Sequence, residues 1–171
     1  MSRINKQNPF FQKLLKDGPV TILKVQDQQF ILEIVEVGEP ETLDTITAGD
    51  IQTILVNLKR EPAETIELEA AIADIEDQLM PIISELPNRR CLATYEQAFW
   101  NIAKVAGFGS DDKLQLNVDT VEEVFNRLVD VAYGTPAHWL DVPEDREFAA
   151  TVLFLRELMH HASFNSIILR H

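Results

Sequence analysis

A segment near the carboxyl end of this chain is apolar around most of a helical circumference, and it constrains the fold more than any other feature. The segment, 144–161, follows a helix-start signal at Asp141-Val-Pro-Glu144. A helix on a protein surface has one apolar stripe, whereas a helix that is apolar nearly all round must be enclosed. We therefore expect a central core helix here, or one that a partner covers. Its apolar residues are Phe148, Ala149, Val152, Leu153, Phe154, Leu155, Leu158 and Met159.

A second apolar pattern, between residues 62 and 86, predicts a long helix that packs along another helix. Its aliphatic residues recur at alternating spacings of four and three, which is a heptad seam. Pro81 lies within the seam and is expected to kink or break the helix. The flanking positions include Glu69 and Glu76 and carry no base, so a self-paired coiled coil would repel itself. The seam is expected to pack inside the protein or on a basic partner. Its members are Leu68, Ile72, Ile75, Leu79, Ile82 and Leu86.

The remaining segments complete the predicted architecture. Residues 20–25 and 30–37 are β-branched and apolar around a polar four-residue loop, which predicts an antiparallel hairpin. Shorter helices are expected to begin at Pro9, near Thr47 or Asp50, at a capping box from Thr94 to Gln97, and at Asp119. Residues 114–118 predict a short strand, and 166–169 predict either a final strand or a helix extension.

The predicted fold class is therefore α+β, mainly helical, with five or six helices and a small N-terminal antiparallel β-hairpin. With 171 residues, the chain is long enough for one domain, and we expect a single domain over 1–171. The alternative is two lobes, an acidic 1–87 and an electroneutral 88–171, joined at Pro87-Asn-Arg-Arg90.

The formal net charge of −13 is concentrated in one segment. Residues 27–87 contain fifteen acids and two bases, whereas the rest of the chain is balanced. An acidic face disfavours direct binding of DNA or RNA, because basic patches are the usual footprint of such binding. It attracts a basic protein partner, or it simply keeps a solvated surface soluble.

The compartment and the absence of membrane contact are predicted from three features: the polar start, the lack of a long apolar segment and the single cysteine. A polar, basic start without an apolar core is not a secretory signal, and no window is long and apolar enough to cross a bilayer. The single cysteine excludes a disulfide framework and is typical of a reducing compartment. We therefore expect a cytoplasmic protein that does not bind membranes.

The run Glu157-Leu-Met-His160-His161 resembles a metal site more than any other part of the sequence. Glu157 and His160 share one helix face at the spacing that di-iron carboxylate bundles use. Such bundles need a second pair, and the other histidines, His138 and His171, lack the matching glutamate. Histidines at a helix end also satisfy terminal carbonyls and the helix dipole. We therefore predict no metal and no cofactor, and keep Glu157, His160 and His161 as the weak metal candidates.

Two further segments contain residues that are typical of chemistry or binding. Cys91 follows two arginines that would favour its thiolate, but the sequence places no base beside it, so we expect a buried small residue. The turn from Tyr133 to Trp139 presents Tyr133, His138 and Trp139 close together, which is typical of interface anchors or of a covered helix end. The sequence contains no glycine-rich phosphate loop and no nucleophile elbow.

With no catalytic constellation, the main hypothesis is a non-enzymatic interaction protein, such as an adaptor, chaperone, inhibitor or immunity-type protein. Its acidic 27–87 face would bind a basic partner, and a homodimer is also kept open. One alternative is a small metal-dependent or hydrolytic enzyme that uses Glu157, His160 and His161. Another is an acidic mimic of nucleic acid. The expected interaction residues are Glu64, Glu67, Asp74, Asp77, Tyr133, His138 and Trp139.

Overall fold

The computed structural model describes residues 9–36, 42–87, 91–109, 111 and 113–171. Within them lie six α-helices, one short 3₁₀ helix and six strands. The predicted loop at 88–90 lies outside the described residues, as do the start of the chain and the end expected for the second strand at residue 37. In chain order the elements are α1 (Pro9–Leu15), β1 (Val20–Gln26), β2 (Gln29–Glu36), β3 (Thr42–Asp50), α2 (Ile51–Asn57), α3 (Thr65–Ile83), β4 (Cys91–Thr94), α4 (Gln97–Val105), β5 (Lys113–Asn117), α5 (Val118–Ala132), η1 (Ala137–Trp139), α6 (Arg146–His161) and β6 (Ser166–Arg170).

The six strands form one mixed sheet in the order β3-β2-β1-β4-β6-β5. Strand β2 pairs antiparallel with both β1 and β3, so these three strands form a meander. Strands β1, β4 and β6 are parallel, with Leu23, Thr94 and Leu169 in register, and β5 closes the edge antiparallel to β6. Strands β2 and β3 are added to one edge of β1, and β4 is then added to the opposite edge of β1. The boundary between β1 and β4 is therefore the point at which the strand order reverses.

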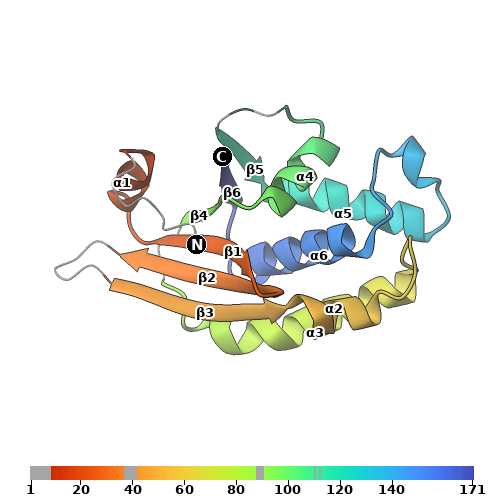
Figure 1. Ribbon diagram of the computed structural model, residues 1–171, viewed down its shortest axis with the longest axis horizontal. Coiled ribbons are helices and arrows are strands. Elements are labelled where there is room, and N and C mark those ends of the chain that lie inside the picture. The colour runs from red at the N-terminus through yellow and green to blue at the C-terminus, as the bar shows by residue number, and fades with distance from the viewer. Residues whose placement is uncertain (1–8, 37–41, 88–90, 110, 112) are drawn as a thin grey trace.

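The helices cover the two faces of this sheet unequally. Figure 1 shows α1 apart from the other helices, and the side chains of Phe11 and Leu15 pack there against Val20 and Ile22 of β1. The other face carries α6, which contacts α2, α3, α4 and α5. Eleven of its residues are buried. The predicted central core helix is thus confirmed, and α6 is enclosed by this chain's own helices and sheet.

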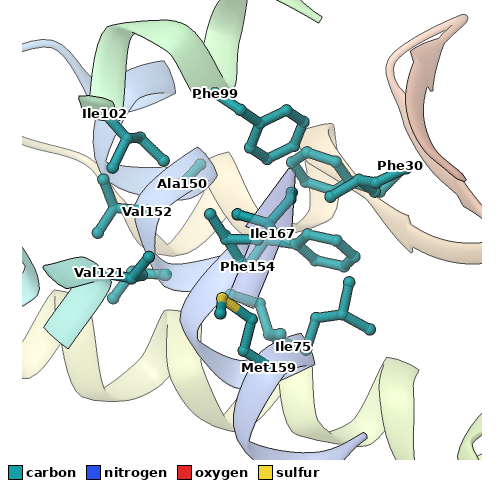
Figure 2. Packing of buried hydrophobic residues seen from close by; sticks show 14 of the residues in the cluster. Phe30, Ile75, Phe99, Ile102, Val121, Ala150, Val152, Phe154, Met159 and Ile167 are labelled. Atoms are coloured by element: carbon teal, nitrogen blue, oxygen red, sulfur yellow. The ribbon is translucent and has the colours of Figure 1, made fainter. Parts of the chain in front are cut away.

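The centre of the core is a stack of two phenylalanine rings, one from the sheet and one from α6. The rings of Phe30 and Phe154 are 3.8 Å apart between centroids and 7° from parallel. Figure 2 shows them with Phe99 above and Ile75 of α3 and Met159 below, all buried. This stack fixes the distance between α6 and the sheet.

The predicted fold class is wrong in its strands. The helix count agrees with the expected five or six, and the β1–β2 hairpin forms, but the hairpin belongs to a six-stranded mixed sheet. The region of Thr47 was expected to start a helix and instead lies in β3, while Asp50 caps α2 by accepting a hydrogen bond from the Thr53 N–H at 3.1 Å. Thr94 was assigned to a capping box and instead ends β4. Neither β4, which is the strand that joins the hairpin to β6 and β5, nor the edge strand β3 was predicted from the sequence.

The helix that carries the heptad seam, α3, packs inside the protein, which was one of the two predictions for it. Leu68, Ile75 and Leu79 are buried, and α3 contacts α6 along its length. Pro81 does not break the helix, which continues to Ile83, because the proline lies so close to the end that few backbone hydrogen bonds depend on it. None of the helices in the described parts of the chain combines the length and apolar character that crossing a bilayer requires.

Replacing Thr21 with valine is expected to stabilise the protein. Thr21 lies in β1 with no exposed surface, and its hydroxyl has no hydrogen-bond partner among the residues that the structure describes. An unsatisfied buried hydroxyl costs free energy, so a methyl group of similar size should raise the free energy of unfolding by about 1 kcal/mol. Urea denaturation measures this as a higher midpoint with an unchanged slope.

The chain contains a matched control for this substitution. Thr94 is equally buried on the adjacent strand, but its hydroxyl donates to the Leu23 carbonyl at 2.8 Å and accepts from the Glu96 N–H at 3.1 Å. Thr94→Val should therefore destabilise the protein by about 1–2 kcal/mol. If both variants shift the midpoint in the same direction, the difference in hydrogen bonding does not govern their stability.

Candidate functional site

The carboxyl ends of the three parallel strands meet at one edge of the sheet. In open α/β sheets, ligands bind outside the carboxyl ends of strands, at the point where strand order reverses. Here that point lies between β1 and β4. The Thr94 hydroxyl ties the end of β4 to Leu23, and the Glu96 carboxylate accepts a hydrogen bond from the Val25 N–H at 3.3 Å. Glu96 is thus a half-buried carboxylate held at the reversal point.

Basic and aromatic side chains gather at the same edge, next to β4. The antiparallel register places Lys113, at the start of β5, opposite Arg170, at the end of β6. Both cations lie over the ring of Phe10, with the Arg170 Cζ 4.6 Å and the Lys113 Nζ 4.7 Å from its centroid. Burial raises the pKa of Tyr95, and Arg170 offsets this only in part. A strongly acidic protein therefore has a basic, aromatic-lined edge at the ends of its parallel strands.

A second polar cluster lies at the end of α6, between α3 and α5. Arg156 is its centre: the guanidinium donates to both oxygens of Glu122 on α5, at 2.7 and 3.2 Å, and to the Oε1 atom of Glu157. Burial alone would raise the pKa of Glu122, but hydrogen bonds from Arg156 and His160 outweigh it and hold that pKa below its usual value. The side chain of Glu157, which is 4% exposed, lies beside the same guanidinium.

Three potential metal ligands converge on the other side of α6. The His161 Nε2 lies 3.1 Å from the Glu76 Oε1 and 3.4 Å from the Glu157 Oε2. All three ligand atoms lie within 4.8 Å of one another. Glu157 and His161 are one helical turn apart on α6, and Glu76 comes from α3. Carboxylate and imidazole together form a donor set that suits zinc and other first-row divalent cations.

The structure divides the histidine run that the sequence singled out. Glu157 and His161 come together, whereas His160 turns to Glu122 on α5, at 3.1 Å. The third member of the triad, Glu76, was missed as a ligand. A signal for it was present, because Glu76 flanks the heptad seam, and flanking residues border whichever helix the seam contacts. What the pattern could not supply was the identity of that helix.

The acidic residues expected to face a partner lie in unlike environments. Glu67 is buried, and its carboxylate accepts hydrogen bonds from the Glu64 N–H at 2.8 Å and the Lys59 N–H at 3.2 Å. It therefore holds the start of α3 and does not present an open surface. Glu64 and Asp77 are exposed. Asp74 is half-buried, and burial is the main cause of its raised pKa.

The other sequence candidates are placed as follows. Cys91 is half-buried at the start of β4, and burial raises the pKa of its thiol, which disfavours the thiolate. Tyr133 and Trp139 are 77% and 72% exposed, so they do not cover a helix end as packed core residues. The ring of His138 meets Trp139 edge-on at 6.1 Å.

Comparison with known proteins identifies relatives by structure alone. No protein-family model matches the sequence, and no curated protein matches it. Among solved structures, the Ppx/GppA enzyme of Aquifex aeolicus matches 90% of this chain with a TM-score of 0.66 at 8% identity, over 54% of its own length. A type II variant structure of the Aquifex aeolicus Ppx/GppA phosphatase matches 93% of this chain with a TM-score of 0.65 at 9% identity, over 55% of its length. An exopolyphosphatase from Cytophaga hutchinsonii matches 92% with a TM-score of 0.62 at 11% identity, over 54% of its length.

These matches show an actin-like fold, and this chain spans about half the length of the proteins it matches. They also overturn the main hypothesis drawn from the sequence. The matched structures include a Ppx/GppA phosphatase and an exopolyphosphatase. The description as a chaperone-like, adaptor or inhibitor protein is therefore wrong, and the hydrolytic alternative fits better.

Proposed function

We propose that this chain is a unit of a hydrolytic enzyme that cleaves phosphoanhydride bonds in chains of phosphate. The observation that carries the proposal is the fold, which matches a Ppx/GppA enzyme over 90% of this chain and an exopolyphosphatase over 92% of it. Because these proteins are about twice as long, full activity is proposed to require a second lobe, either elsewhere in the same polypeptide or in another copy. The site of action is proposed to be the cytoplasm, in line with the single cysteine.

The substrate is proposed to bind along the carboxyl edge of β1, β4 and β6. Arg170 and Lys113 supply the positive charge there, and a guanidinium forms paired, charge-assisted hydrogen bonds with phosphate oxygens. A net charge of −13 repels polyanions elsewhere, so a local basic edge would select where a phosphate chain lies.

Glu96 is proposed to orient and activate the attacking water. Hydrolysis needs a base within hydrogen-bond reach of the nucleophile, and carboxylates commonly fill that role. Glu96 sits at the strand-order reversal, next to the basic edge, and the Val25 N–H fixes its orientation. The water would attack the terminal phosphorus, the anhydride oxygen would leave, and inorganic phosphate would be released.

The test measures polyphosphate binding by the chain itself and phosphate release by the chain together with its second lobe, both with Mg²⁺ present. Glu96→Gln is expected to reduce phosphate release by about 100-fold or more, because a positioned base contributes this much, and to leave binding intact. The double variant Arg170→Met with Lys113→Met is expected to weaken polyphosphate binding by at least about tenfold, because it removes two charge-assisted contacts.

The control for charge alone is Lys59→Met with Lys104→Met, which removes two exposed lysines away from this edge. It leaves the same net charge as the double variant and should bind polyphosphate as the unaltered protein does. Failure of the unaltered chain to bind polyphosphate, or equal weakening in both double variants, would contradict the proposal.

A further inference from the structure

We infer that Glu76, Glu157 and His161 form a binding site for one zinc-like divalent cation that ties α3 to α6. Both carboxylates already lie near coordinating distance from the imidazole, and all three ligand atoms lie within 4.8 Å of one another. Ligands placed tetrahedrally at about 2.0–2.2 Å from zinc lie roughly 3.3–3.6 Å from one another. The distances from the His161 Nε2 to the Glu76 Oε1 and the Glu157 Oε2 are 3.1 and 3.4 Å.

The orientation of Glu157 supports this site independently of the distances. Arg156 holds its Oε1 atom, while its Oε2 atom faces His161. A fixed outer partner that orients a ligand carboxylate is a regular feature of metal sites. The carboxylate is almost fully buried, so it cannot swing out to solvent, and the cation would replace a contact between Glu157 and a histidine with a stronger one.

The other two ligands are partly exposed to solvent, which gives a cation access to the site. The side chains of His161 and Glu76 are 29% and 44% exposed. A cation can therefore enter from solvent without opening the core, and water can complete its coordination. The mixture of imidazole and carboxylate favours zinc over magnesium or calcium, which prefer oxygen ligands alone.

The site is structural rather than catalytic, because it lies at the opposite end of β6 from the basic edge. Helix α6 ends at His161, a four-residue link follows, and β6 then runs from Ser166 to Arg170. The triad thus adjoins the amino end of β6, whereas Arg170 marks its carboxyl end. The inference does not rest on the proposed phosphate chemistry, and either can fail without the other.

The experiment titrates chelator-treated full-length protein with Zn²⁺ and measures stoichiometry, affinity and the unfolding temperature. One zinc ion per chain and a higher unfolding temperature are expected, because a ligand that binds only the folded state stabilises it. Glu76→Gln and His161→Asn should each weaken binding by at least about tenfold. His160→Asn is the matched control, since it alters the adjacent histidine, which contacts Glu122 and not the triad.

A measurement on the unaltered protein guards against variants that fail to fold. Diethyl pyrocarbonate modifies accessible histidines, and mass spectrometry locates the modified residues. Zinc should protect His161 and leave His160 and His138, which are both exposed, as reactive as before. Absence of a one-to-one zinc complex, equal weakening in His160→Asn and His161→Asn, or zinc that protects all three histidines alike would overturn the inference.

Discussion

Gly49→Val is expected to lower the free energy of unfolding by about 3 kcal/mol, because overpacking a tight core typically costs 1–3 kcal/mol and valine adds three carbons. Gly49 lies in β3 opposite Phe30, where the register shifts by a bulge. A Cβ atom at this position would lie 2.9 Å from the Phe154 Cε2 and 3.4 Å from the Phe30 Cδ2. Both rings are fully buried and stacked on each other, so neither can move away without separating α6 from the sheet.

Packing and strand propensity predict opposite changes in the free energy of unfolding for Gly49→Val. Valine is a better strand residue than glycine, so propensity alone predicts stabilisation at Gly49. Gly109→Val is the control, because a Cβ atom there would have nothing within 4 Å. Thermal unfolding of both variants gives the comparison, and Gly49→Val with Phe154→Leu should recover part of the loss. If Gly49→Val and Gly109→Val unfold at the same temperature, contact with the two rings does not govern the stability at Gly49.

The helical half of the fold could be predicted from sequence because its signals are periodic and local. The apolar circumference of 144–161 predicts an enclosed helix, and α6 is enclosed. The heptad seam predicts a helix that packs along another helix, and α3 packs on α6. The sheet could not be predicted in the same way. Strand β4 has only four residues, and β3 has polar residues such as Asp44 and Thr47 because it is the edge strand. Strand β4 in addition pairs with β1 and β6, which are both distant from it in sequence.

The candidate sites show the same limit. The histidine run at the end of α6 could be read from the sequence, but the choice between His160 and His161 depends on which neighbouring helix each one faces. The basic edge was not predicted at all, since Lys113 and Arg170 are far apart in the chain and meet only through the β5–β6 register. The net charge gave no sign of this edge, because a balance over the whole chain does not show where single cations lie.

Arg156→Met is expected to cost about 3 kcal/mol of folding free energy, because removing one partner of a buried ion pair leaves the other charge uncompensated. Arg156 joins two helices: it binds Glu122 on α5 and Glu157 on α6, and its guanidinium lies 4.1 Å from the ring centroid of Phe125. The Glu157 side chain is only 4% exposed, so water cannot replace the lost cation. Methionine keeps much of the apolar stem, which limits the loss of packing.

A double-mutant cycle isolates the charge from the packing. Glu157→Gln removes the buried charge, so Arg156→Met combined with Glu157→Gln should be more stable than Arg156→Met alone, with a coupling energy of about 1–3 kcal/mol. Arg60→Met is the control, because the pair of Arg60 with Glu64 is exposed on both sides and should contribute less than about 1 kcal/mol. The measurement is urea unfolding of metal-free protein. Additive effects of Arg156→Met and Glu157→Gln would show that the ion pair between these two neighbours on α6 contributes nothing to stability.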